Sequence, residues 1–204
     1  MTYLLRRCGR RTWFCFLLVL CLGSVAARAP QAGLPLLYER YDVLFNVRAD
    51  GTVHVREVQR IWFGGEFHTA FADIPLALTN GISNLQVSEG DQPYTFDPVA
   101  ARPGAFTVEQ DDQTVYVSWE YTPTTPGEMR TFYLDYDVDG GLWVYPDQQI
   151  LEWRAVPAER SGILVQASTV TVTLPAAVAP GHLEIAAYGP KYTNNVLSDT
   201  VVFT

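Results

Sequence analysis

Three aspartates alternate along one short segment and are followed by a glycine, in the order Asp135-Tyr-Asp137-Val-Asp139-Gly140. Oxygen ligands at alternate positions before a turn glycine resemble the opening of a calcium-binding loop. The twelfth position of such a loop needs a bidentate glutamate, and here it is Pro146. The segment therefore has two interpretations: the solvated face of a strand, or a non-helical calcium site. No cofactor other than calcium is expected.

Two aromatic residues, Trp143 and Tyr145, lie in a predicted loop at residues 139–149 that is rich in glycine and proline. An aromatic ring with a polar edge suits an exposed contact surface, and turn residues favour exposure here. Trp119 and Trp153 differ, because they lie in alternating segments where tryptophan fills a sandwich core. We expect Trp143 and Tyr145 to be the first candidates for binding a ligand.

Paired carboxylates could hydrolyse glycosides if two of them were held roughly 5–10 Å apart in a cleft. Candidates on expected strands are Glu120, Asp135, Asp137 and Glu152. The chain has 22 acidic residues, so accidental pairs are easy to find. Its three histidines are isolated and lack zinc-ligand spacing. We therefore expect no enzymatic activity, with a glycosidase as a minor alternative.

The N-terminal 27 residues have the three-part layout of a secretory signal peptide. Four arginines precede an apolar run at residues 13–22, and small residues follow it. The run is shorter than the about 20 residues that a membrane span needs. We expect export with cleavage after Ala27, and retention as an uncleaved anchor is the alternative. Residues 28–37 are expected to be a linker, and residues 38–204 a single domain.

Charge and cysteine content limit the partners and the compartment. The chain has a formal net charge of −8, and without the four leader arginines ten basic residues face 22 acidic ones, a net charge of −12. Such acidity argues against binding nucleic acid or anionic lipid headgroups. All three cysteines lie in the leader, so the exported domain must fold without disulfides.

Period-two alternation of apolar residues indicates strands along most of residues 37–203. The first two expected strands, at residues 37–48 and 52–63, flank an Ala49-Asp50-Gly51 turn. Glu57 and Gln59 interrupt the inward face of the second, and a bulge near Glu57 would restore its phase. Further strands are expected at residues 82–87, 93–96, 105–109, 114–121, 129–138, 142–144, 149–153, 168–174, 182–187 and 200–203. With no helical period, the fold class is all-β: an antiparallel β-sandwich, immunoglobulin-like or related.

Several short motifs occur in a characteristic order. They are Tyr-Asp-Val-x-x-x-Val-x-x-Asp-Gly-Thr-Val-x-Val-x-Glu at residues 41–57, Phe-Gly-Gly-x-Phe at 63–67, Asp-Ile-Pro at 73–75, Phe-x-Leu-x-Tyr-x-Val at 132–138, Leu-x-Trp at 151–153 and Val-Thr-Val-Thr-Leu-Pro at 170–175. Together they resemble the N-terminal extracytoplasmic domain of a bacterial family of predicted membrane proteins, domain of unknown function 2207. Ala72 departs from the family, which often has a basic residue just before Asp-Ile-Pro.

The resemblance implies a leader, an extracytoplasmic β domain, and then transmembrane helices, with no catalytic residue to carry over. We expect the chain to be the N-terminal part of a longer protein. Contact with the membrane would then occur only through the leader or a C-terminal anchor. The expected function is a non-catalytic binding domain at the cell surface, or extracellular, for an unknown protein or glycan. The alternative is a secreted carbohydrate-binding sandwich.

Overall fold

A computed structural model describes residues 35–77, 79–99, 101–156, 163–179, 182–187, 193–196 and 199–204. These belong to one of two units of the chain, residues 33–204. The predicted leader at residues 1–27 and most of the predicted linker lie outside the described residues. The described residues form fifteen strands and no helix. No described segment is therefore a helix able to cross a membrane.

The larger sheet is built around three long neighbouring strands, β1 (Leu36–Val47), β2 (Val53–Phe63) and β9 (Glu128–Asp139). The turn between β1 and β2 forms as its residues predict, because Gly51 takes a φ of 88° and the Asp50 carboxylate accepts a hydrogen bond from the Thr52 N–H. The strand order is β14-β15-β13-β1-β2-β9-β4-β5, with β12 beside β1. The remaining members are β4 (Gly81–Glu89), β5 (Gln92–Pro93), β12 (Leu164–Val165), β13 (Val170–Thr173), β14 (Asn194–Val196) and β15 (Thr200–Phe203).

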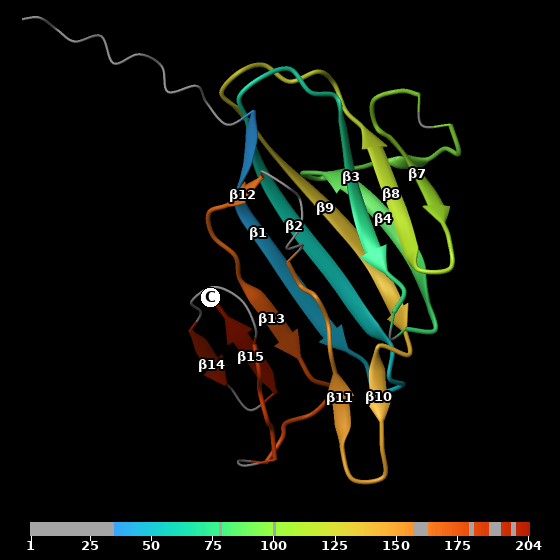
Figure 1. Ribbon diagram of the computed structural model, residues 1–204, viewed down its shortest axis with the longest axis vertical. Helices are drawn as coiled ribbons and strands as arrows, with labels where there is room; N and C mark the ends of the chain where they lie inside the picture. Colours follow the sequence, from blue (N-terminus) through green and yellow to red (C-terminus); the bar gives the residue numbers. More distant parts are fainter. Residues whose placement is uncertain are drawn as a thin grey trace, which may run out of the picture. The chain divides into compact units, whose positions relative to one another are not determined.

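The smaller sheet has the order β3-β8-β7-β6 and packs over β9 and β4 (Figure 1). Its strands are β3 (Thr69–Pro75), β6 (Thr95–Phe96), β7 (Ala105–Gln110) and β8 (Thr114–Glu120). The Trp119 ring on β8 lies 5.8 Å from the Phe132 ring on β9, centroid to centroid. Side chains of both sheets share one hydrophobic core, which confirms the predicted all-β sandwich.

The core follows the alternation seen in the sequence. On β1 the buried residues are Tyr38, Tyr41, Val43, Phe45 and Val47, and the inward positions of β2 and β9 continue the same layer. Each large apolar side chain buried there stabilises the fold by about 1.5–3 kcal/mol. Trp119 is fully buried as predicted, whereas Trp153, also expected in the core, is only partly buried and packs against it.

Three details of the pairing differ from expectation. The sheets are mixed rather than purely antiparallel, because β1 pairs in parallel with β12 and β13, and β6 with β7. The register shifts at the start of β1, between Tyr38 and Arg40, and in β4, between Ser83 and Gln86, while Glu57 keeps its register with both neighbouring strands. Residues 182–187 form no strand, and β15 and then β14 continue the sheet outward from β13.

Candidate functional site

A small hairpin projects from the lower end of the sandwich in Figure 1 and carries the exposed aromatic residues. It pairs β10 (Leu142–Val144) with β11 (Gln149–Leu151) in a sheet of its own. Trp143 stands directly opposite Ile150, and period two puts Tyr145 on the same face. The exposed fractions of Trp143 and Tyr145 are 40% and 41%, which confirms the exposure expected from the sequence.

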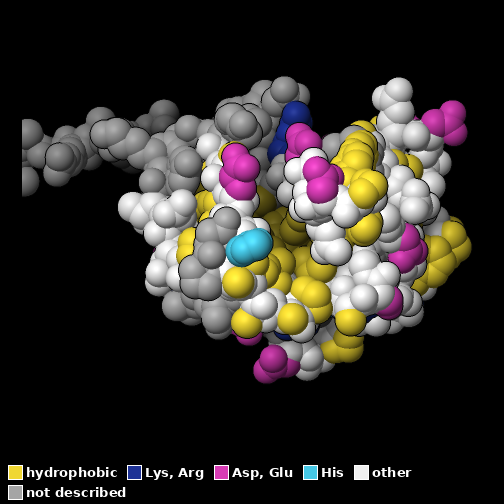
Figure 2. All heavy atoms as spheres, turned by 90° about the horizontal axis from the view of Figure 1, so that it is seen from below, with side chains coloured by type: hydrophobic (Ala, Val, Ile, Leu, Met, Phe, Trp, Pro, Cys, Tyr) yellow, Lys and Arg dark blue, Asp and Glu magenta, His cyan; other side chains and the backbone are white. Residues whose placement is uncertain are grey.

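This face is hollowed as well as aromatic. Trp143, Tyr145, Ile150 and Glu152 line a cavity of about 180 Å³, and the two rings are 6.4 Å apart and tilted by 44°. Figure 2 views the molecule from this end and shows hydrophobic side chains gathered around a hollow. Pockets for drug-sized ligands measure about 300–1,000 Å³, so this cavity suits a single side chain or ring of a larger partner.

Packing on the opposite face holds the hairpin against the sandwich. Strands of three residues do not form a stable hairpin alone in water. Leu142 and Leu151 pair across the hairpin and pack against the hydrophobic core. Just after β11, the Trp153 ring meets the Phe45 ring edge-on, with centroids 6.3 Å apart. The aromatic face is therefore presented on a supported element rather than on a loose loop.

Two glycines form the corner where β9 passes into the hairpin. Gly140 takes a φ of +68°, and a Cβ added there would lie 2.4 Å from the Asn80 side-chain nitrogen. A Cβ at Gly141 would lie 2.9 Å from a Val138 methyl group. Cβ atoms do not approach other atoms this closely, so a side chain at either position would force Asn80 or Val138 to shift, and at Gly140 the positive φ adds backbone strain. The corner consequently fixes the direction in which the hairpin leaves the sheet.

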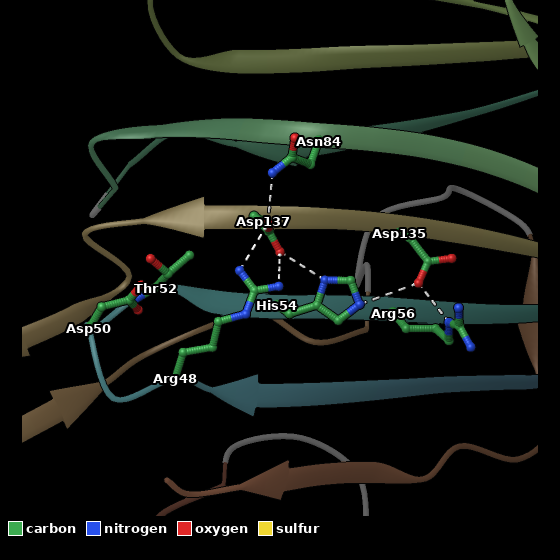
Figure 3. Close-up of polar contacts among 8 residues, drawn as sticks. All are labelled: Arg48, Asp50, Thr52, His54, Arg56, Asn84, Asp135 and Asp137. Atoms are coloured by element: carbon green, nitrogen blue, oxygen red, sulfur yellow. Dashed lines mark hydrogen bonds and ion pairs between the residues drawn. The ribbon is translucent and has the colours of Figure 1, made fainter.

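Next to this corner, Asp137 is the centre of a polar network on the outer face of the larger sheet (Figure 3). Arg48 binds both carboxylate oxygens, with nitrogen–oxygen distances of 2.9 and 3.0 Å. The Nδ1 atom of His54 and the amide nitrogen of Asn84 contact the same carboxylate at 2.8 and 2.9 Å. Burial would raise the Asp137 pKa, but the hydrogen bonds from Arg48, Asn84 and His54 outweigh it and lower the pKa to about 2. The network joins β2, β4 and β9 to the end of β1.

The other two aspartates of the alternating segment are placed differently. Asp135 accepts a hydrogen bond from Arg56 at 2.6 Å, and Asp139 is exposed. Among the residues that the structure describes, no group of three or more histidine, cysteine or acidic side chains is arranged to hold a metal. A cation at Asp135, Asp137 and Asp139 would have to displace two guanidinium groups. The calcium site stays a prediction, and these ion pairs give it no support.

The four carboxylates considered for glycoside hydrolysis do not meet in one cleft. Asp135 and Asp137 point outward from the larger sheet, whereas Glu120 points outward from the smaller one. These are opposite faces of the sandwich, so Glu120 cannot pair with either aspartate. Glu152 lies apart from them, in the hairpin cavity.

A second polar group on the smaller sheet brings together a hydroxyl, an imidazole and a carboxylate. The Nδ1 atom of His68 lies 3.0 Å from both Thr69 Oγ1 and Glu120 Oε2, and Thr69 also donates directly to Glu120 at 2.8 Å. A catalytic relay uses the two different ring nitrogens, one for the nucleophile and one for the acid. Here a single nitrogen faces both partners, so the group has no relay geometry.

Between the sheets lies a buried polar cluster that explains the interrupted alternation of β2. The Glu57 carboxylate accepts hydrogen bonds from the hydroxyls of Tyr41 and Tyr136, and from the Gln59 amide at 3.2 Å. Burial, followed by the nearby Glu57 carboxylate, raises the Tyr136 pKa well above 10. Glu57 and Gln59 therefore point inward in phase, and no bulge is needed.

Comparison with known proteins identifies a family. A family model described as "Predicted membrane protein (DUF2207) N-terminal domain" matches residues 38–204. This confirms the resemblance expected from the order of the sequence motifs. No curated protein matches the chain.

Among solved structures, the chain is similar to an M1 zinc metallopeptidase from Deinococcus radiodurans, at 17% identity and a TM-score of 0.39. The match covers 84% of this chain and 38% of that chain. A structure described as a putative protease from Parabacteroides distasonis gives 13% identity and a TM-score of 0.37, covering 84% of this chain and 35% of that chain. The chain spans less than two fifths of the length of either protein.

Proposed function

Because the chain belongs to the DUF2207 family of predicted membrane proteins, matched over residues 38–204, we propose that these residues form a non-catalytic, extracytoplasmic binding domain of a membrane-associated protein. The leader-like layout of residues 1–27 supports the extracytoplasmic location. An alkaline phosphatase fusion after Thr204 tests it, because that enzyme is active only outside the cytoplasm. We expect an active fusion, and a matched fusion that lacks residues 1–27 should be inactive. A full-length fusion that is produced but inactive would contradict the location.

One observation supports the binding role: two partly exposed aromatic side chains lie side by side on a hairpin that packs against the sandwich. The sandwich buries other residues of the same types, Trp119 and Tyr121, whereas it leaves Trp143 and Tyr145 partly exposed. Exposed aromatic residues that border a cavity are typical of contact surfaces, where tryptophan and tyrosine dominate binding energy. The size of the cavity favours one side chain of a protein partner as its occupant.

Site-specific cross-linking tests this surface. A photo-reactive amino acid replaces Ile150, which stands opposite Trp143 on the aromatic face of the hairpin and is 38% exposed. The matched control replaces Leu44, which lies on β1 and is 42% exposed. A specific adduct at Ile150 that Trp143→Ala removes is expected. Equal adducts at both positions, or an adduct that survives Trp143→Ala, would contradict the assignment.

A glycan is the second candidate ligand, because Trp143, Tyr145 and Glu152 combine a stacking surface with a hydrogen-bond acceptor. Titration of tryptophan fluorescence with soluble polysaccharides distinguishes a glycan ligand from a protein partner. A saturable change that Trp143→Ala abolishes would favour the glycan. The absence of a response across a polysaccharide panel would dismiss it.

A further inference from the structure

The outer face of the smaller sheet has a charge pattern unlike that of the rest of the fold. Its four strands carry Asp73, Glu109 and Glu120 and contain no lysine or arginine. On the outer face of the larger sheet, in contrast, several acidic residues pair with guanidinium groups, as in Arg48–Asp137 and Arg56–Asp135. Within the described part of the chain, Asp73 and Glu109 form no ion pair.

The pairing of the strands puts an aromatic ring between these two carboxylates. Tyr116 on β8 stands directly opposite Asp73 on β3 and directly opposite Glu109 on β7. Residues opposite each other in antiparallel strands have Cβ atoms about 4.5–5.5 Å apart. All three side chains point outward, and the exposed fraction of the Tyr116 side chain is 42%. The Tyr116 hydroxyl donates to the Asp111 carboxylate at 3.1 Å, which holds the ring in place.

Next to Tyr116 and the two carboxylates, a second aromatic side chain is exposed on the same face of the sheet. Phe71 on β3 is 56% exposed, and its partners across the sheet are the small residues Ser118 and Thr107. The face thus has a ring flanked by two carboxylates, beside a second exposed ring next to small side chains. A guanidinium group fits this arrangement, because it stacks on aromatic rings while it donates hydrogen bonds to carboxylates.

We propose that the outer face of β3, β8 and β7 docks an arginine-rich segment of a partner polypeptide, with one guanidinium seated on Tyr116 between Asp73 and Glu109. This occupant is chosen because its positive charge complements the acidic face. A second copy of this chain would bring a net charge of −8 against an acidic face, which disfavours self-association. The surface is separate from the hairpin that carries Trp143, so its test does not depend on the proposed function.

Fluorescence anisotropy with a labelled peptide of alternating arginine and glycine tests the proposal on the full chain. The variants are Asp73→Asn with Glu109→Gln, and Tyr116→Leu. The charge-matched control is Asp91→Asn with Asp199→Asn, two exposed positions beside strands of the other sheet. Combining all three substitutions at the site should weaken binding by about tenfold, since exposed ion pairs and cation–π contacts each contribute a few-fold.

Three outcomes decide the proposal. It is supported if the site variants lose affinity, if the control binds like the wild type, and if a lysine–glycine peptide binds more weakly than the arginine peptide. Equal losses in the site variants and the control would overturn it, because they would show only nonspecific attraction to an acidic protein. Competition by millimolar Ca²⁺ at constant ionic strength would also overturn it, in favour of a metal site. Unchanged thermal unfolding confirms that the variants are folded.

Discussion

Replacing Asp137 with asparagine tests whether its buried ion pair holds the strand ends beside the aromatic hairpin. The carboxylate is almost fully buried and receives Arg48, His54 and Asn84. Its pKa is lowered from 3.8 to about 2. A depressed folded-state pKa stabilises the protein above the unfolded-state pKa, and this stabilisation is lost as the pH falls through the folded-state value.

The expected loss of stability follows from the pKa shift of Asp137. Each pKa unit corresponds to about 1.4 kcal/mol, so a shift of about two units stabilises the fold by roughly 2–3 kcal/mol at neutral pH. The substituted asparagine would keep the shape of the side chain but lose its charge, and hydrogen bonds to charged groups contribute about 1.5–3 kcal/mol. We therefore expect Asp137→Asn to lower the free energy of unfolding by about 2 kcal/mol at pH 7. The difference from the wild type should shrink between about pH 4 and pH 2.

Urea unfolding followed by tryptophan fluorescence at several pH values measures both effects. The matched control is Asp135→Asn, two residues away on the same strand and the same face. Its partner Arg56 is 52% exposed, and exposed ion pairs contribute about 0–1 kcal/mol, so a loss below about 1 kcal/mol is expected. Equal losses for the two variants at pH 7 would refute the reasoning. A gap between Asp137→Asn and the wild type that stays constant down to pH 2 would do the same.

Three further predictions concern the hairpin corner, the tryptophans and the tyrosines. Gly140→Ala should lower the thermal unfolding temperature more than Gly127→Ala does. An alanine at either positive φ loses about 1–2 kcal/mol of stability, but only at Gly140 does the added Cβ also meet a neighbouring side chain. Trp143→Ala should change the free energy of unfolding by less than about 1 kcal/mol, whereas Trp119→Ala should cost about 3–5 kcal/mol because that side chain is fully buried. In an alkaline titration of phenolate absorbance, Tyr94, Tyr121 and Tyr136 should ionise only as the protein unfolds above pH 10, because burial raises the pKa of each hydroxyl and its stabilising effect is lost as the pH rises.

Much of the fold was predictable from the chain because strand formation has a local signature. Alternation with period two identified the inward residues of β1 and β9, and Asp50-Gly51 identified the first turn. The exposure of Trp143 and Tyr145 followed from the glycine and proline around them. Motif order identified the family. All of these predictions depend on local sequence and on motif order, and none depends on which distant segments are in contact.

Only the tertiary structure decided where the polar groups go. Glu57 and Gln59 point into the core because hydroxyls from β1 and β9 meet them there, and the sequence of β2 alone suggested a bulge instead. Asp137 is buried by Arg48 and Asn84, which are 89 and 53 residues away in the chain. The sheet pairing separates Glu120 from Asp137 and puts Tyr116 between two carboxylates. Burial and ion pairing depend on contacts between segments far apart in sequence, and a local pattern carries no information about those contacts.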